Sequence, residues 1–213
     1  MTYRLYFSPG SAALVVHQAL LEIGAPFELH KLDTEAREHK QAAYLALNPN
    51  GTVPTLVIDG KPHYETCALL LALVERHPEA RLAPPVGDPT RIDFLQWMIH
   101  LANTMQPAFR LWFYPSDASD DSTQYDAIKD KARSRIEELF ARFDALMADG
   151  RPYLLGDRFS VLDLYLVMLM RWSRNMPKPA LTFPHLRALA DRVRARPSWD
   201  AMYEQQGLTE WQR

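Results

Sequence analysis

The apolar positions at the start of the chain follow two different periods. Residues 4–7 and 27–32 are short runs typical of strands, and residues 12–23 between them repeat apolar side chains at helical spacing. Gly24, directly after that run, is a common helix end. A strand, a helix and a strand in this order predict a parallel strand pair joined by a right-handed crossover.

A hairpin and another helix are predicted next. Residues 55–58 form a short apolar run, and Asp59-Gly60 separates it from a second strand-like run at residues 61–64. This dipeptide is a strong signal of a two-residue hairpin loop. Thr66 follows as a candidate N-cap of a helix that continues through residues 68–74. The complete order, βαβ followed by ββα, predicts a thioredoxin-like domain.

The rest of the chain is predicted to be helical. Phe94, Met98, Leu101 and Met105 recur on one helical face, and Pro107 is expected to kink or end that helix. Further helices are predicted at residues 125–147, 161–172, 186–196 and 198–205. Ser160 and Asp163, three residues apart before an apolar run, predict a capping box in front of a buried central helix.

A proline-rich segment separates the two patterns. Residues 78–89 contain four prolines and one glycine, which is typical of a linker. We therefore predict a fold of the α/β plus all-α class. Its parts are a thioredoxin-like domain at residues 1–78, a linker at residues 79–89 and an all-helical domain at residues 90–213.

Composition narrows the function classes. A chain of 213 residues with 47% hydrophobic residues can bury a substantial core, and a net charge of −2 gives no basic field that would favour nucleic acid or an anionic membrane as partner. The longest apolar stretch, residues 161–170, contains Asp163 and is too short to span a bilayer. No signal peptide is visible. The single cysteine, Cys67, excludes an internal disulfide and offers no metal cluster, so a reducing cytoplasm is expected.

The loop before the hairpin carries candidate chemistry. A cis peptide at Val53-Pro54 would leave the Val53 amide and carbonyl outside the sheet, where they could pair with a peptide-like ligand. The helix beginning near Thr66 offers unpaired amides for a carboxylate, and Glu65 beside it would take an ammonium group. Carboxylate and ammonium on one carbon describe an α-amino acid end.

These residues, Asn48-Pro49-x-Gly51-x-Val53-Pro54 and then Glu65-Thr66 before a helix, resemble the glutathione site of the cytosolic glutathione transferases. The resemblance implies that the Val-Pro peptide is cis and meets the cysteinyl backbone of glutathione. It also implies that Thr52 belongs to the site and that Glu65 and Thr66 hold the γ-glutamyl end. Glutathione would be a co-substrate, with no metal required.

The resemblance implies a hydroxyl donor that keeps the glutathione sulfur ionised, since a free thiol has a pKa of about 8.5. Ser11, at the start of the first helix, matches the serine of the serine-type classes, although it could simply cap that helix. Tyr6 resembles the catalytic tyrosine of the tyrosine-type classes, without the rest of their motif, and could instead be a core residue. Ser8 is a third candidate.

The first helix is most similar to the bacterial beta class, in Ser8-Pro9-Gly10-Ser11 and in His17. The class cysteine would fall at Ala12 and the second-domain histidine near Asn103, so thiol transferase activity through a mixed disulfide is put in doubt. Cys67, inside the third helix, is expected to be a small hydrophobe rather than a replacement.

The remaining contacts are expected from several positions. Arg37 and Lys40 are candidates for the glycyl carboxylate, and the resemblance implies that Gln96 reaches across a homodimer interface. Aromatic density after Pro107 suggests a pocket for a hydrophobic electrophile, although such a stripe is more often core. The candidate lining residues of this pocket are Met105, Phe109, Trp112, Phe113 and Tyr114.

The resemblance thus implies a homodimeric, cytoplasmic glutathione transferase that serves detoxification. Two alternatives stay open. One is a non-catalytic protein of the same fold that binds glutathione or a ligand, or regulates a partner. The other is a glutathione-dependent isomerase or dehalogenase.

Overall fold

The computed structural model describes residues 2–211 and divides them into two compact units. The first unit contains residues 2–83 together with residues 195–211, and the second contains residues 84–194. The sequence pattern placed the last helix with the other helices of the second half, whereas the structure groups it with the first unit.

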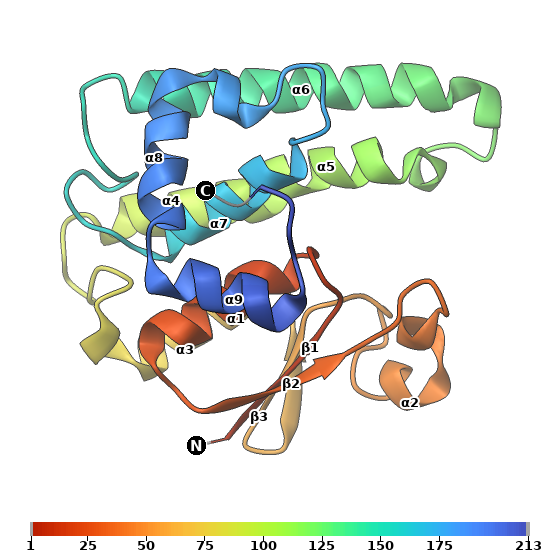
Figure 1. Cartoon of the computed structure of the whole chain (residues 1–213), viewed down its shortest axis with the longest axis horizontal. Coiled ribbons are helices and arrows are strands. Elements are labelled where there is room, and N and C mark those ends of the chain that lie inside the picture. The colour runs from red at the N-terminus through yellow and green to blue at the C-terminus, as the bar shows by residue number, and fades with distance from the viewer. Residues whose placement is uncertain (1, 212–213) are drawn as a thin grey trace. The chain divides into compact units, whose positions relative to one another are not determined.

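A four-stranded mixed sheet organises the first unit (Figure 1). Its strands are β1 (Tyr3–Phe7), β2 (Phe27–Lys31), β3 (Thr55–Ile58) and β4 (Lys61–Tyr64). Their order is β2-β1-β3-β4, with β1 parallel to β2 and antiparallel to β3, and β3 antiparallel to β4. Asp59 and Gly60 join β3 to β4 with φ angles of 49° and 84°, which confirms the predicted hairpin.

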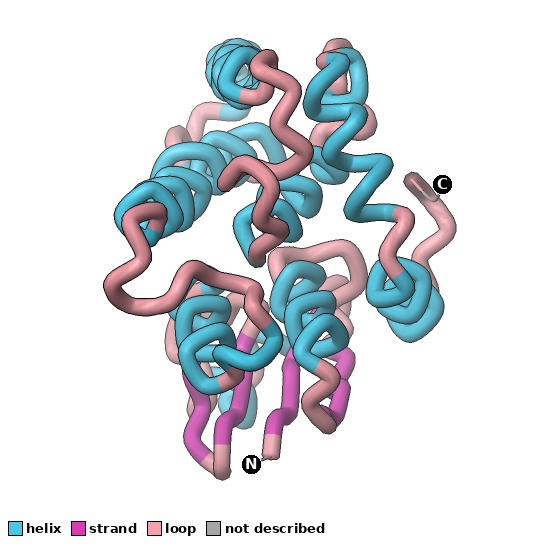
Figure 2. Tube along the Cα trace, turned by 90° about the vertical axis from the view of Figure 1, so that its left-hand side faces the viewer, coloured by secondary structure: helices cyan, strands magenta, loops and turns pink. Residues whose placement is uncertain are grey.

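Three helices of this unit are longer than two turns, and α1 and α3 lie side by side against the sheet (Figure 2). The helices are α1 (Ala13–Ile23), α2 (Ala42–Leu45), α3 (Thr66–Arg76) and α9 (Pro197–Gln206), with 3₁₀ turns at Glu38–Lys40 and Pro78–Ala80. Gly24 ends α1 at φ 72°, as predicted. The prediction that Thr66 caps α3 is wrong. Glu65 is the N-cap residue and Thr66 is the first helical residue, because Glu65 adopts φ 74° and turns the chain one residue earlier.

The second unit is helical. Its helices are α4 (Arg91–His100), α5 (Gln106–Phe113), α6 (Tyr125–Leu146), α7 (Val161–Trp172) and α8 (Pro184–Arg194), with 3₁₀ turns at Pro115–Asp117, Ser122–Gln124 and Ala180–Thr182. A π-helical segment, Leu101–Met105, joins α4 to α5 directly before Pro107. Such a segment is a usual way to accommodate a break in the helical ladder. Every residue of α7 from Val161 to Arg171 is buried, as expected of a central helix.

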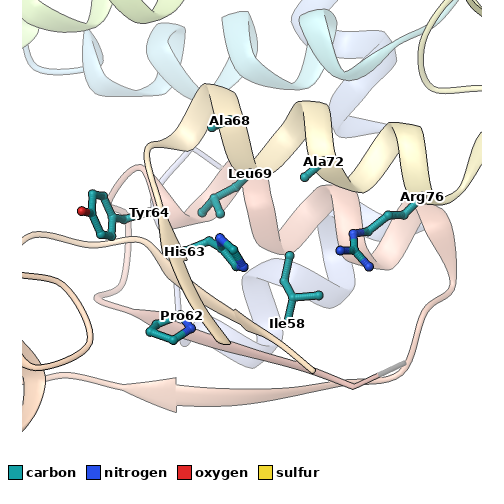
Figure 3. A pocket seen from close by; sticks show the side chains of 8 residues that line it. All are labelled: Ile58, Pro62, His63, Tyr64, Ala68, Leu69, Ala72 and Arg76. Atoms are coloured by element: carbon teal, nitrogen blue, oxygen red, sulfur yellow. The ribbon is translucent and has the colours of Figure 1, made fainter. Parts of the chain in front are cut away.

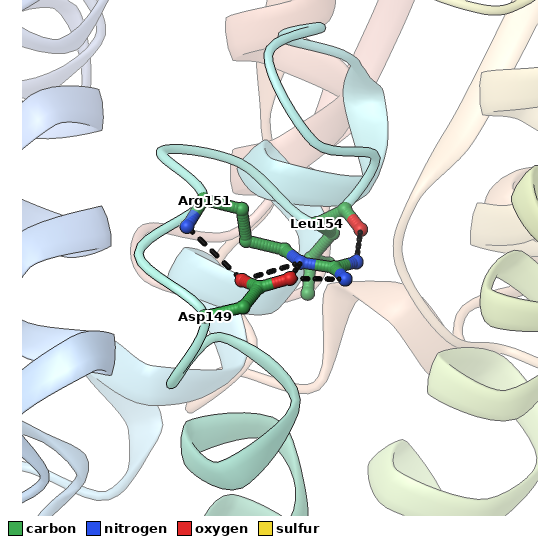
Figure 4. Close-up of polar contacts among 3 residues, drawn as sticks. All are labelled: Asp149, Arg151 and Leu154. Carbon is green, nitrogen blue, oxygen red and sulfur yellow. Dashed lines mark hydrogen bonds and ion pairs between the residues drawn. The ribbon is translucent and has the colours of Figure 1, made fainter.

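The capping box in front of α7 is confirmed. The Ser160 amide donates to Asp163 Oδ2 at 2.8 Å, and the Leu162 amide donates to Ser160 Oγ. Asp163 Oδ1 also accepts from the Leu154 amide at 2.9 Å. The loop that supplies Leu154 is held by Arg151, whose guanidinium binds both oxygens of Asp149 and the Leu154 carbonyl (Figure 4). Burial raises the pKa of Asp163 to about 7, although these amide bonds oppose that shift.

Residues 2–211 lack two features that would indicate other classes of protein. They contain no helix with the length and apolarity needed to cross a membrane, and no group of three or more His, Cys, Asp or Glu side chains suited to hold a metal ion.

Candidate functional site

The loop before β3 leaves one peptide unit without a partner in the sheet. The Val53-Pro54 bond is cis, as expected. The Thr52 carbonyl is turned inward, where it accepts from Tyr44 Oη at 2.7 Å and from Asn48 Nδ2 at 2.8 Å. The β1–β3 ladder stops at the Tyr6–Thr55 pair. Within residues 2–211, no backbone hydrogen bond involves the amide or carbonyl of Val53, so both are available to a ligand.

The start of α3 provides a second set of free donors. Glu65 is exposed, has φ 74° and ψ 104°, and directs its own carbonyl into the helix, where the Leu69 amide donates to it at 2.9 Å. The amides of the first turn have no intrahelical acceptor, and no acidic residue lies in that turn. A helix N-terminus of this kind favours an anion, while the neighbouring Glu65 carboxylate favours a cation.

Ser11 lies in the loop between β1 and α1. Its Oγ donates to the Ser8 carbonyl at 2.7 Å and accepts from the Ala13 amide at 3.3 Å. Because β1 and β3 are antiparallel, the loop that follows Phe7 and the Val53-Pro54 peptide that precedes Thr55 lie at the same end of the sheet. Ser11 belongs to that loop. Ser8 itself shares a hydrogen bond of 3.1 Å with Thr34.

Tyr6 lies on the other face of the sheet from Leu5 and Phe7. Its ring contacts those of His30 and Tyr44, with centroids 4.6 and 5.8 Å apart. The pKa of the Arg4 guanidinium is raised, mainly by Glu28 and to a smaller extent by Tyr6. The Tyr6 ring thus lies on the face of the sheet opposite to Phe7, whose ring contacts His17 of α1. It does not pack beneath α1, as a core tyrosine would.

Of the two candidates for the glycyl carboxylate, Lys40 lies against the loop. Its Nζ donates to the Asn50 carbonyl at 3.2 Å. A Cβ placed on Gly51, which has φ 56°, would come within 2.9 Å of that Nζ and 2.8 Å of the His39 carbonyl. This close approach requires glycine. Arg37 is exposed and adopts φ 57°.

The structure corrects part of the predicted electrophile pocket. Met105 and Phe109 have no exposed surface. Phe109 packs against Phe140 and Trp172 within the second unit, so both residues are core. Phe113 is 44% exposed and Trp112 is partly exposed. Tyr114 is 52% exposed, so Trp112, Phe113 and Tyr114 keep a surface that a ligand could contact.

Gln96 is exposed on α4, at a pocket of about 220 Å³. The pocket is lined by Gln96, Trp97, His100, Arg142 and Phe143. Burial, with Arg135 and Arg142 nearby, lowers the pKa of His100. A larger groove of about 460 Å³ lies between β4 and α3, over Ile58, His63, Leu69 and Arg76 (Figure 3). None of the predicted glutathione contacts lines that groove.

Ala12 and Cys67 are the two positions that bear on whether the site has a reactive cysteine. Ala12 is buried at the start of α1, where the beta class has its cysteine. Cys67 is half-buried in the first turn of α3, and burial together with Glu65 raises the pKa of its thiol. Neither position provides a low-pKa thiolate.

One group of residues near Ser11 was not predicted from the sequence. Gln206 of α9 accepts a hydrogen bond from the Gly10 amide at 3.2 Å and contacts His17 of α1. The only signal was a histidine within an apolar helix, and nothing in the sequence connects it to a residue near the end of the chain.

The four-stranded sheet with its helices defines a thioredoxin-like unit, and the chain continues into a helical unit. The model of the glutathione S-transferase N-terminal domain matches residues 11–76, and that of the C-terminal domain matches residues 100–197. With relatives of at least 30% identity over nearly the whole chain, these matches show that the chain belongs to the glutathione S-transferase family.

Three relatives illustrate the similarity. A sphingomonad glutathione S-transferase, solved in complex with glutathione, is 32% identical with a TM-score of 0.84, over 97% of this chain and 100% of that one. The beta-class enzyme of Sphingomonas chungbukensis is 30% identical with a TM-score of 0.85, over the same shares. Glutathione S-transferase GstA of Escherichia coli O157:H7 is 27% identical over 96% of this chain and 99% of its own length.

Proposed function

We propose that this protein is a glutathione transferase that binds reduced glutathione in the first unit and transfers its sulfur to a hydrophobic electrophile. The observation that carries the proposal is the unpaired main chain of Val53, which lies at the same end of the sheet as the Ser8–Ser11 loop. An extended peptide can add to such an edge through main-chain hydrogen bonds.

The ligand's three residues have separate partners in this arrangement. The cysteinyl backbone pairs with Val53, next to Thr52. The γ-glutamyl carboxylate accepts from the first amides of α3, including that of Thr66, and its ammonium pairs with Glu65. Lys40, which already lies across the Asn50 carbonyl, is the better placed cation for the glycyl carboxylate, with Arg37 as the alternative.

Ser11 is the proposed donor to the glutathione sulfur. Its hydroxyl hydrogen is given to the Ser8 carbonyl in the structure, and rotation about one side-chain bond would give it to a ligand sulfur instead. This hydrogen bond favours the thiolate over the thiol, so the thiol proton is released to solvent. The sulfur then attacks an electrophilic carbon with its electron pair. A C–S bond forms, and in a substitution the leaving group departs with the electrons of its former bond.

The electrophile is proposed to contact the apolar surface of Trp112 and Phe113. We further propose a cytoplasmic homodimer in which Gln96 reaches the partner's glutathione, as the family resemblance implies. A role in detoxification follows from the same resemblance.

Turnover of an activated chloronitroarene with glutathione tests the proposal, with glutathione binding measured separately by calorimetry. Binding and turnover are expected in the wild-type protein. Binding without turnover of any electrophile would favour the non-catalytic alternative. Turnover only of an isomerisable or halogenated substrate would favour the isomerase or dehalogenase alternative. Absence of binding at millimolar glutathione would refute the proposed function.

A further inference from the structure

Helix α1 contains two buried polar side chains, His17 and Gln18, within its run of buried apolar residues. His17 has no exposed surface and Gln18 is 2% exposed. Burying such groups is unfavourable unless they form hydrogen bonds. Both find their partners on α9, which the chain reaches only after the entire second unit.

The His17 ring is held from both sides. Its Nε2 lies 2.9 Å from Gln205 Oε1, and its Nδ1 lies 3.0 Å from Gln206 Nε2. With these amide orientations, Nε2 carries the proton and donates to Gln205, while Nδ1 accepts from Gln206. Burial lowers the pKa of His17 to about 4, so the ring is neutral at ordinary pH and keeps one donor and one acceptor.

This tautomer fixes the orientation of Gln206. Because Nδ1 is an acceptor, Gln206 must present its NH₂ group to the ring, and its Oε1 then points the other way. That oxygen accepts from the Gly10 amide at 3.2 Å. The reverse orientation would place two donors against each other at Gly10. Gln206 is 5% exposed, so water cannot readily replace either bond.

Gly10 directly precedes Ser11 and adopts φ 74°. The Ser8–Ser11 turn is closed on one side by its own bonds, since the Ser11 amide and Oγ both donate to the Ser8 carbonyl. On the other side it is fastened by Gln206. The two attachments together restrain the main chain from which the Ser11 side chain extends.

We propose that Gln206 is a positioning residue for Ser11: oriented by His17, it holds Gly10 and thereby aims the Ser11 hydroxyl at the sulfur of bound glutathione. This inference rests on the proposed function. It gives Gln206, in the last helix, a role in ionising the thiol of bound glutathione.

The test is a double-mutant cycle on the pKa of bound glutathione, measured from the ultraviolet absorbance of the thiolate as pH is varied. Gln206→Met keeps the length of the side chain but forms neither hydrogen bond. It is expected to raise the thiolate pKa toward the Ser11→Ala value, so that turnover near pH 6.5 falls severalfold and recovers at high pH. In the Ser11→Ala background the same change should leave the thiolate pKa where it is, because the group through which Gln206 acts is absent.

Gln18→Met is the matched control. It removes the bond of 3.2 Å from Gln18 Nε2 to Ser198 Oγ, between the same two helices but without a link to Gly10. It should lower stability and leave the thiolate pKa unchanged. Gln206→Asn, one methylene shorter and unable to reach both partners, replaces Gln206→Met if that variant does not fold.

The outcomes separate the two proposals. If the wild-type protein binds glutathione without ionising it, or does not bind it, the proposed function fails and this inference fails with it. If the wild type ionises glutathione but the folded Gln206 variant keeps the wild-type thiolate pKa, or raises that pKa equally in the Ser11→Ala background, the positioning role is refuted and the proposed function stands.

Discussion

Replacing Ser11 with alanine tests the chemistry of the site most directly. The change removes a hydroxyl that lies in the loop between β1 and α1, at the end of the sheet where the Val53-Pro54 peptide also lies. The magnitude follows from the bonds that are exchanged when glutathione binds. A hydrogen bond to a charged acceptor contributes about 1.5–3 kcal/mol, whereas the neutral bond to the Ser8 carbonyl that must be given up contributes about 0.5–1.5 kcal/mol.

The difference, about 1 to 1.5 kcal/mol, corresponds to roughly one pKa unit at 1.36 kcal/mol per unit. Ser11→Ala should therefore raise the pKa of bound glutathione by about one unit and lower turnover below that pKa about tenfold. The Ala13 amide also loses its acceptor, so we expect a stability loss of about 0.5–1 kcal/mol, the lower part of the range for N-terminal side-chain caps.

Two assays separate the two roles of Ser11, which are to donate a hydrogen bond to the glutathione sulfur and to cap the start of α1. The thiolate absorbance of bound glutathione, followed from about pH 5 to 9, gives the pKa, and urea unfolding gives the stability. Tyr6→Phe is the control. Since the Tyr6 ring packs against His30 and Tyr44 and Tyr6 lies outside the Ser8–Ser11 loop, removal of its hydroxyl should leave the thiolate pKa unchanged. An unchanged pKa in Ser11→Ala, or a shift confined to Tyr6→Phe, would refute the assignment.

Three further predictions concern the scaffold. Asp163→Asn places an NH₂ group against one of the two main-chain amides, of Ser160 and Leu154, that donate to the Asp163 carboxylate. We expect urea unfolding to show a loss of stability of about 2–4 kcal/mol. A loss of stability well below about 1 kcal/mol would contradict this prediction. Tyr44→Phe removes one of two donors to the Thr52 carbonyl, and calorimetry should show glutathione binding weakened about three- to tenfold; unchanged affinity would mean that Asn48 alone holds the loop. His17 has a folded pKa of about 4, below its ordinary 6.5, so the unfolded chain takes up a proton first as pH falls. Its contribution is complete above pH 6.5, and up to about 3 kcal/mol should be lost by pH 4. A His17→Leu variant should lack that part of the pH dependence.

Features set by neighbouring residues were predictable from the sequence. The Asp59-Gly60 hairpin, the Gly24 helix end and the capping box at Ser160 each depend on groups within a few residues of one another. The cis peptide at Val53-Pro54 followed from the family resemblance rather than from local chemistry.

Features set by distant contacts were not predictable. The sequence predicts the N-cap of α3 at Thr66, because hydroxyl side chains are common at that position. The main chain instead turns at Glu65, which adopts a positive φ that is uncommon for residues other than glycine and asparagine. Phe109 was expected at a pocket because aromatic residues line ligand sites, but α6 and α7 supply partners that enclose it. The return of α9 to the first unit, which brings Gln206 to His17, joins positions separated by 189 residues.

The departures from the beta-class pattern determine where the reactive sulfur must come from. Ala12 gives the start of α1 a buried methyl group, and Cys67 has a raised thiol pKa in the first turn of α3. A protein disulfide with glutathione would need a thiolate at one of these positions. With neither available, the sulfur that reacts is that of the bound co-substrate, and its ionisation depends on donors that the chain can aim. We propose Ser11 as that donor, because its Oγ is bonded to the Ser8 carbonyl and the neighbouring Gly10 amide is bonded to Gln206.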